Sequence, residues 1–188
     1  MNDQPLQLTV HLRLGAYYAL DAKQFFDRYL MTCNVMEHSA WKFKCFTDLL
    51  MAAECALKAH ICAASNPPPA AEMLRGFRNG QGHKIDDLAD LAHQSSASPI
   101  FERVKALLGR HQVHLRYSLE AEQGVFILSD LSYKPHDASW ANIATNAVED
   151  LISALPRFPD LPKDWDQRVA FERELYVSYR DSFRRKRS

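Results

Sequence analysis

Glu54 and Lys58 are the clearest pair of side chains in this sequence with complementary chemistry. An acid four positions before a base is the favourable order for an ion pair on one helical face. At about 100° per residue, Glu54 lies roughly 40° from the centre of the apolar stripe of its predicted helix. A carboxylate beside a core needs a partner, either Lys58 or an arginine from elsewhere in the chain. The alternative is a half-exposed pair that stabilises the helix only slightly.

The spacing of the other reactive residues argues against metal and nucleotide-loop chemistry. His111 and His114 are three positions apart without an acid at metal-ligand spacing, so we expect no metal site. The sequence contains no GxGxxG, GxxxxGK[ST], GxSxG or HExxH motif, and we expect no cofactor. The four cysteines form no CxxC pair, which predicts reduced and buried thiols.

A glycine-containing loop over residues 76–82 is predicted to precede a helix over 83–94. Backbone N–H groups at the start of that helix, with Arg78 and Asn79 beside them, would form an anion pocket. Arg116 and Tyr117 would add a guanidinium and a stacking ring if the fold returns them to that pocket. Alternatively, Arg116 pairs with Glu54 inside the protein and Tyr117 fills the core.

The length and composition predict one domain, or one domain with an appendage. The chain has 188 residues, of which 47% are hydrophobic, and its 23 basic residues balance its 23 acidic residues. This balance excludes a global basic field, so a polyanion would have to bind a local patch. The sequence has neither 18 consecutive apolar residues nor an export signal, and we therefore expect a cytoplasmic protein without a membrane span.

The pattern of apolar residues predicts a mainly helical protein. The expected helices cover residues 16–32, 40–64, 70–74, 83–94, 99–110, 140–155 and 164–183. Ser39, Ser98 and Ser139 are the expected N-caps. Residues 6–14 alternate between apolar and polar side chains, which predicts a strand paired with residues 125–128 or with a second subunit. Residues 113–136 show no clear pattern.

The helix over residues 40–64 has two apolar faces, which predicts a central position in the fold. One face carries large side chains. The other carries small ones, namely Cys45, Ala52, Cys55, Ala56, Ala59 and Cys62. Small side chains allow another helix to approach closely, so this face packs internally or forms a subunit interface.

Three segments, in this order, resemble the signatures of the HEPN domain family. They are Ala53-Glu54-Cys55-Ala56-Leu57-Lys58-Ala59, then Gly82-His83-Lys84-Ile85, and then Leu115-Arg116-Tyr117. The resemblance implies an up-and-down helical bundle over residues 37–156. Residues 1–36 would add a short β element and a first helix, and residues 157–188 a proline linker and an extra amphipathic helix that ends in the basic run Arg184–Arg187.

The resemblance also implies a function. HEPN domains are commonly homodimers that bind RNA or nucleotides, and they are often encoded beside a nucleotidyltransferase in toxin–antitoxin or phage-defence modules. Some are metal-independent ribonucleases with an Arg-x4-His motif, which Arg78 and His83 match in spacing. An imidazole can exchange protons with RNA while a guanidinium holds the phosphate. The alternative is a protein–protein adaptor that uses the small-residue face and the C-terminal helix.

Overall fold

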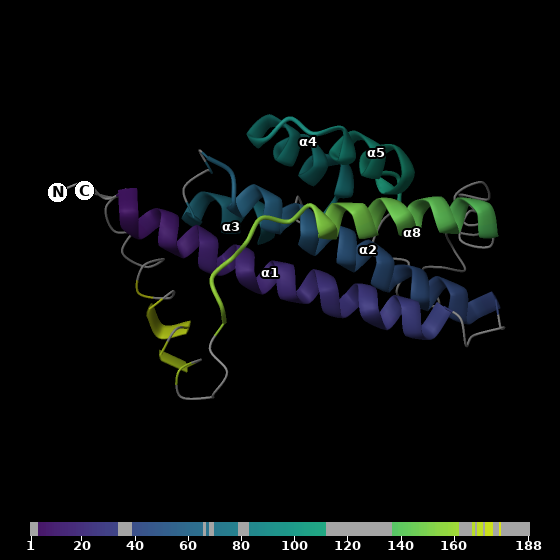
Figure 1. Cartoon of the computed structure of the whole chain (residues 1–188), viewed down its shortest axis with the longest axis horizontal. Coiled ribbons are helices and arrows are strands. Elements are labelled where there is room, and N and C mark those ends of the chain that lie inside the picture. The colour runs from purple at the N-terminus through teal and green to yellow at the C-terminus, as the bar shows by residue number, and fades with distance from the viewer. Residues whose placement is uncertain are drawn as a thin grey trace.

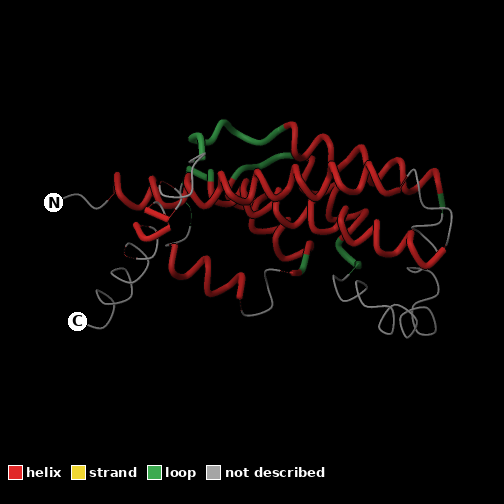
Figure 2. Tube along the Cα trace, turned by 90° about the horizontal axis from the view of Figure 1, so that it is seen from below, coloured by secondary structure: helices red, strands yellow, loops and turns green. Residues whose placement is uncertain are grey.

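The protein is a bundle of helices in the computed structural model, which describes residues 4–33, 39–65, 67, 70–78, 83–111 and 137–161, with 167, 169–170, 172–174 and 177. The helices are α1 (Gln4–Cys33), α2 (Ser39–Cys62), α3 (Ala70–Arg78), α4 (Ile85–Ser95), α5 (Pro99–Leu108) and α8 (Ala138–Ser153). Throughout this described part the chain forms helices and loops without a strand (Figure 2). The predicted mainly helical class is confirmed.

Helix α2 is the centre of the bundle, as its two apolar faces predict. It contacts α1, α4, α5 and α8. Figure 1 shows α1 and α2 as two long antiparallel helices, with α8 beside α2 and with α4 and α5 on the side of α2 away from α1. Neighbours on several sides explain why few positions of α2 are polar.

The small-residue face of α2 packs inside the single chain. Its six members, Cys45, Ala52, Cys55, Ala56, Ala59 and Cys62, are at most 5% exposed. Burial raises the pKa of both Cys55 and Cys62 to about 12, so these two cysteines remain thiols at neutral pH. Of the two alternatives for this face, the structure shows internal packing.

The predicted strand over residues 6–14 is wrong, because these residues belong to the 30-residue helix α1. The alternation that suggests a strand includes apolar residues at positions 6, 10 and 14, which are also four residues apart, and the same spacing continues at 18, 22 and 26. A period of two therefore contains the helical i, i+4 spacing. Val10, Ala22 and Phe26 are buried in this helix, which continues through the predicted helix over 16–32 without a break.

The helix ends match the sequence predictions only in part. Ser98 caps α5, and its hydroxyl accepts a hydrogen bond from the backbone N–H of Ile100. The cap of α8 is Asp137 rather than Ser139, because the Asp137 carboxylate accepts from the N–H groups of Ser139 and Trp140. Helix α3 runs beyond the predicted 70–74 to Arg78, and α4 begins at Ile85 rather than at residue 83.

Several predicted features lie outside the described residues, among them the possible strand partner 125–128, the 113–136 region and Arg184–Arg187. From the predicted helix over 164–183, the described residue Glu174 accepts a hydrogen bond from Arg13 of α1 at 2.5 Å. The helices in the described part of the chain are all too short or too polar to span a membrane.

His111, three residues after the end of α5, packs against two aromatic side chains of the core. Its ring lies 5.0 Å from the Phe46 ring and 5.3 Å from the Trp140 ring, measured between centroids. The side chain is buried, and its Nδ1 has no hydrogen-bond partner among the described residues. Burial without a partner penalises the imidazolium and lowers the pKa of His111 to about 4.

This burial makes the stability of the fold dependent on pH. Between the unfolded pKa of about 6.5 and the folded value, the unfolded state binds a proton that the folded state does not, so stability falls as the pH falls. We predict that the wild type loses about 2 kcal/mol more unfolding free energy than His111→Phe between pH 7.5 and pH 5. Urea titrations at both pH values measure this difference, and equal losses in the two proteins contradict the prediction. Burial also lowers the pKa of His60. Because His60 is present in both proteins, its effect on the pH dependence of stability is the same in each and cancels in the comparison.

Candidate functional site

A buried ion pair on α2 forms the base of the candidate site. Glu54 is only 2% exposed, and its Oε1 accepts a hydrogen bond from Lys58 Nζ at 2.5 Å. The Lys58 side chain is 8% exposed. Lys58 is thus the partner that the i, i+4 spacing predicts, and the pair is buried rather than half-exposed. In this setting each charge depends on the other.

Two aromatic rings enclose the Lys58 ammonium from neighbouring helices. Its Nζ lies 5.6 Å from the centroid of the Tyr18 ring on α1 and 5.2 Å from that of the Phe77 ring on α3. The two rings meet edge to face, with centroids 5.9 Å apart. Both rings lie within the range of a cation–π interaction, which adds to the attraction of Glu54. Burial raises the pKa of Tyr18, so its phenol is neutral beside the ion pair.

His83 connects this buried pair to the surface. It lies two residues before α4, and its Nδ1 is 3.2 Å from Oε2 of Glu54. An ionised carboxylate only accepts hydrogen bonds, so Nδ1 is the donor and Nε2 is left to interact with a ligand. The His83 side chain is 54% exposed. Glu54 therefore orients an imidazole that solvent can reach.

The structure brings together three of the residues that the sequence singles out, Glu54, Lys58 and His83. Arg78 is the last residue of α3, and its side chain is outside the described residues. Asn79, Arg116 and Tyr117, together with His114, also lie outside them. Within the described residues, no group of three His, Cys, Asp or Glu side chains is arranged to hold a metal ion.

The start of α4 is less favourable to an anion than its sequence predicts. Its first turn carries Asp86 and Asp87, and Lys84 at the N-cap position makes no side-chain capping bond. The two carboxylates already complement the positive end of the helix dipole and repel a further negative charge. This arrangement makes the imidazole of His83, rather than the helix amides, the group best placed to meet a ligand.

Sequence reasoning does not identify Tyr18 and Phe77 as part of this site. Each occupies an apolar position of its own helix, which is the ordinary place for a core aromatic residue. Their common role depends on how α1 and α3 pack against α2. A buried lysine on a central helix does signal the need for nearby acceptors or aromatic faces, but it does not say which ones.

Fold and site together define a helical-bundle protein with a surface histidine held by a buried ion pair. No protein-family model, curated protein or solved structure matches the chain. The HEPN resemblance therefore depends on the motif residues themselves and stays a prediction.

Breaking the buried pair on one side should be costly. We predict that Lys58→Met lowers the unfolding free energy by about 3–5 kcal/mol, because the Glu54 carboxylate stays buried without its ammonium partner. The double variant Glu54→Leu/Lys58→Met should recover most of that loss, since no uncompensated charge remains. Urea unfolding followed by circular dichroism provides the measurement.

The matched control is Arg103→Met, which removes the partner of Asp150 in an exposed ion pair. We expect a change of less than about 1 kcal/mol for this variant. A Lys58→Met protein that is as stable as Arg103→Met would show that the buried pair contributes no more than a surface pair.

Proposed function

We propose that this protein is a HEPN-like RNA- or nucleotide-binding protein whose ligand phosphate meets His83. The observation that carries the proposal is the contact between His83 and Glu54, which joins two of the motifs on which the resemblance depends. These motifs are separate in sequence, and their convergence on one exposed imidazole suits a binding site. The proposed setting is a toxin–antitoxin or phage-defence system, with a homodimer and a nucleotidyltransferase partner.

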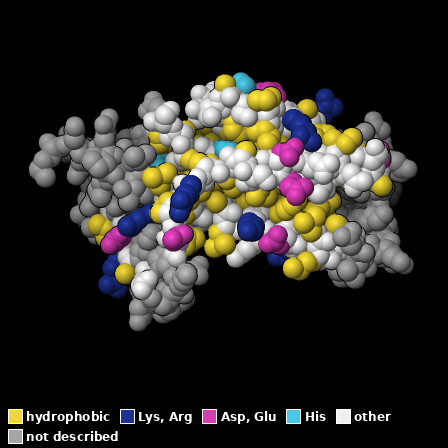
Figure 3. Space-filling view, in the orientation of Figure 1, with side chains coloured by type: hydrophobic (Ala, Val, Ile, Leu, Met, Phe, Trp, Pro, Cys, Tyr) yellow, Lys and Arg dark blue, Asp and Glu magenta, His cyan; other side chains and the backbone are white. Residues whose placement is uncertain are grey.

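The distribution of charge favours a local binding site. Figure 3 shows basic and acidic side chains interspersed on the visible face of the described residues, with apolar side chains between them. The chain has no net charge. Attraction of a polyanion to the whole protein is therefore weak, and affinity must come from a few directed contacts such as a hydrogen bond from His83 Nε2.

Replacement of His83 should weaken RNA binding. We predict that His83→Ala lowers the affinity for a labelled single-stranded RNA about tenfold, the value of one hydrogen bond to a charged group. Fluorescence anisotropy at two salt concentrations measures the affinity and its electrostatic part. His93→Ala is the matched control, because His93, which lies on α4, is also a half-exposed histidine. Equal affinity of all three proteins, or no RNA or nucleotide binding by the wild type, refutes the proposal and favours a protein–protein adaptor.

A second candidate function is a metal-independent endoribonuclease that uses Arg78 and His83. The specific observation in its favour is the orientation of the imidazole by a buried carboxylate, which fixes the ring and its tautomer as proton transfer requires. In this mechanism His83 exchanges a proton with the RNA 2′-hydroxyl or the leaving oxygen. Arg78 would hold the scissile phosphate.

The ribonuclease candidate predicts RNA cleavage in the presence of EDTA. His83→Ala should reduce the rate by about 10²–10⁴-fold, the usual contribution of a general acid or base. Glu54→Gln keeps a hydrogen-bonding side chain beside His83 but leaves the Lys58 ammonium without its carboxylate. Assayed under conditions in which circular dichroism shows it folded, it should slow cleavage less than His83→Ala. Gel electrophoresis of labelled RNA gives the rates. Intact RNA with the wild type across several substrates removes this candidate and leaves the binding proposal standing.

A further inference from the structure

The imidazole of His83 has the arrangement of a nucleophile as well as that of a ligand-binding group. Its Nδ1–H donates to Oε2 of Glu54 at 3.2 Å, so in the neutral ring the lone pair lies on Nε2. Nε2 is at the opposite edge of a ring that is 54% exposed. When Nε2 forms a bond to an electrophile, the ring becomes positively charged, and the carboxylate at Nδ1 stabilises that charge as it develops.

The charges near His83 set a requirement for the electrophile. Lys58 binds the other oxygen of Glu54, so the buried pair has no net charge and does not repel an anion as a bare carboxylate would. At the surface, Lys84 is 3.8 Å from Asp87, and Asp86 also lies in the first turn of α4. These mixed charges attract an anion only weakly. An anionic reagent must therefore react through a good leaving group rather than through tight binding.

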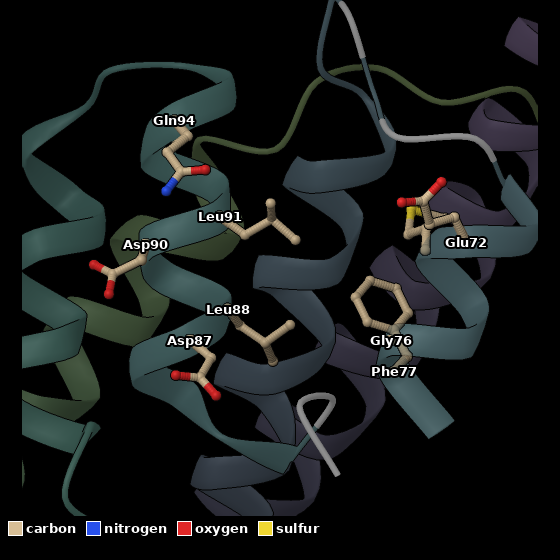
Figure 4. Close-up of a pocket in the computed structure, with 9 residues that line it drawn as sticks. Glu72, Gly76, Phe77, Asp87, Leu88, Asp90, Leu91 and Gln94 are labelled. Atoms are coloured by element: carbon tan, nitrogen blue, oxygen red, sulfur yellow. The ribbon is translucent and has the colours of Figure 1, made fainter. Parts of the chain in front are cut away.

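The packing of α3 and α4 leaves the start of α4 accessible. A pocket of about 370 Å³ lies between the two helices, and Figure 4 shows Leu88 and Leu91 pointing across it toward Phe77. Asp87 lines this pocket from the first turn of α4 and is about half exposed. A small molecule can thus approach from solvent the turn that His83 precedes.

We propose that His83 is a phosphoryl acceptor, modified at Nε2 by a small phosphoryl donor of the phosphoramidate class. The Nε2 lone pair forms a bond to phosphorus, and the phosphorus–nitrogen bond of the donor breaks. Phosphoramidate, whose nitrogen is already protonated, leaves as ammonia with the electron pair of that bond. The proton on Nδ1 stays on the ring, where Glu54 balances the positive charge of the phosphorylated imidazole.

This modification would also regulate the binding site proposed at His83. A phosphoryl group on Nε2 would occupy the atom that the phosphate of RNA is proposed to contact, and it would repel that phosphate. Phosphorylated protein should therefore bind RNA more weakly. Only this consequence rests on the proposed function. The acceptor reaction needs no RNA, so each proposal can fail without the other.

Reaction of the full chain with potassium phosphoramidate near neutral pH tests the proposal. Mass spectrometry of peptides kept in alkali gives the rate at which each histidine gains one HPO₃ group. We expect His83 to react about tenfold faster than His93, which is also half exposed. The nearest carboxylate to His93 Nδ1, from Glu102, is 3.8 Å away and exposed, so it orients that ring poorly. Long-range ¹H–¹⁵N spectra should place the group on Nε2 of His83.

The double variant Glu54→Gln/Lys58→Met removes the carboxylate together with its buried counter-charge. We expect its His83 rate to fall to that of His93. The matched control is Arg103→Met/Asp150→Asn, which removes an exposed ion pair and should keep the wild-type rate.

Three results would overturn the proposal. In the wild type these are a His83 rate no higher than that of His93, or a phosphoryl group on Nδ1, and neither depends on the folding of a variant. The third is a wild-type rate in the Glu54→Gln/Lys58→Met protein when circular dichroism shows it folded.

Discussion

The buried carboxylate of Glu54 is the constraint on which the centre of this bundle depends. A charge removed from water requires nearly all of its lost hydration to be replaced by protein groups. The helix itself supplies one such group, Lys58, at the i+4 position. The second carboxylate oxygen needs a donor from another segment, and His83 provides it. The chain between α3 and α4 is thereby tied to α2 at a defined point.

The ion pair also links α1, α3 and the residue before α4, which have few contacts with one another. Lys58 lies between Tyr18 of α1 and Phe77 of α3, while Glu54 reaches His83 before α4. One pair of charges on α2 therefore touches groups from three other segments. Apolar packing alone tolerates small shifts of helices against each other, whereas a directed contact accepts few arrangements.

Small side chains make this close arrangement possible. A Cβ atom on Gly15 of α1 would lie 3.1 Å from the Cβ of Cys62 on α2, and 2.3 Å from the ring of Phe158. The glycine thus admits both α2 and the segment after α8 to the surface of α1. A larger residue there would separate α1 from α2, and with them Tyr18 from Lys58.

The sequence predicts the central helix and the Glu54–Lys58 pair because both depend on local spacing. The apolar stripes of α2 and the i, i+4 order of the pair are properties of one helix. The strand prediction for residues 6–14 fails for a related reason, since alternate positions also include every fourth position. Local spacing does not decide between them; tertiary packing does, and in the helix Val10 is buried.

The contact of His83 with Glu54 and the enclosure of Lys58 by two rings could not be read from local spacing. Each depends on how α1, α3 and α4 pack on α2, and no periodicity in one segment encodes a partner in another. The order of the motifs singles out His83 as a candidate residue, but it does not identify the partner of the His83 Nδ1 atom. The pocket between α3 and α4 is hidden in the same way, because its lining residues belong to two helices that meet only after packing.

The buried ion pair and the pocket lined by α3 and α4 residues have Phe77 in common. Phe77 separates them, with one neighbour in the ion pair and another side toward the pocket. A rotation of that ring would change the shape of the pocket and the aromatic contact of Lys58 together. Because Lys58 and His83 bind the two oxygens of one carboxylate, Glu54 connects a change at the first to the second.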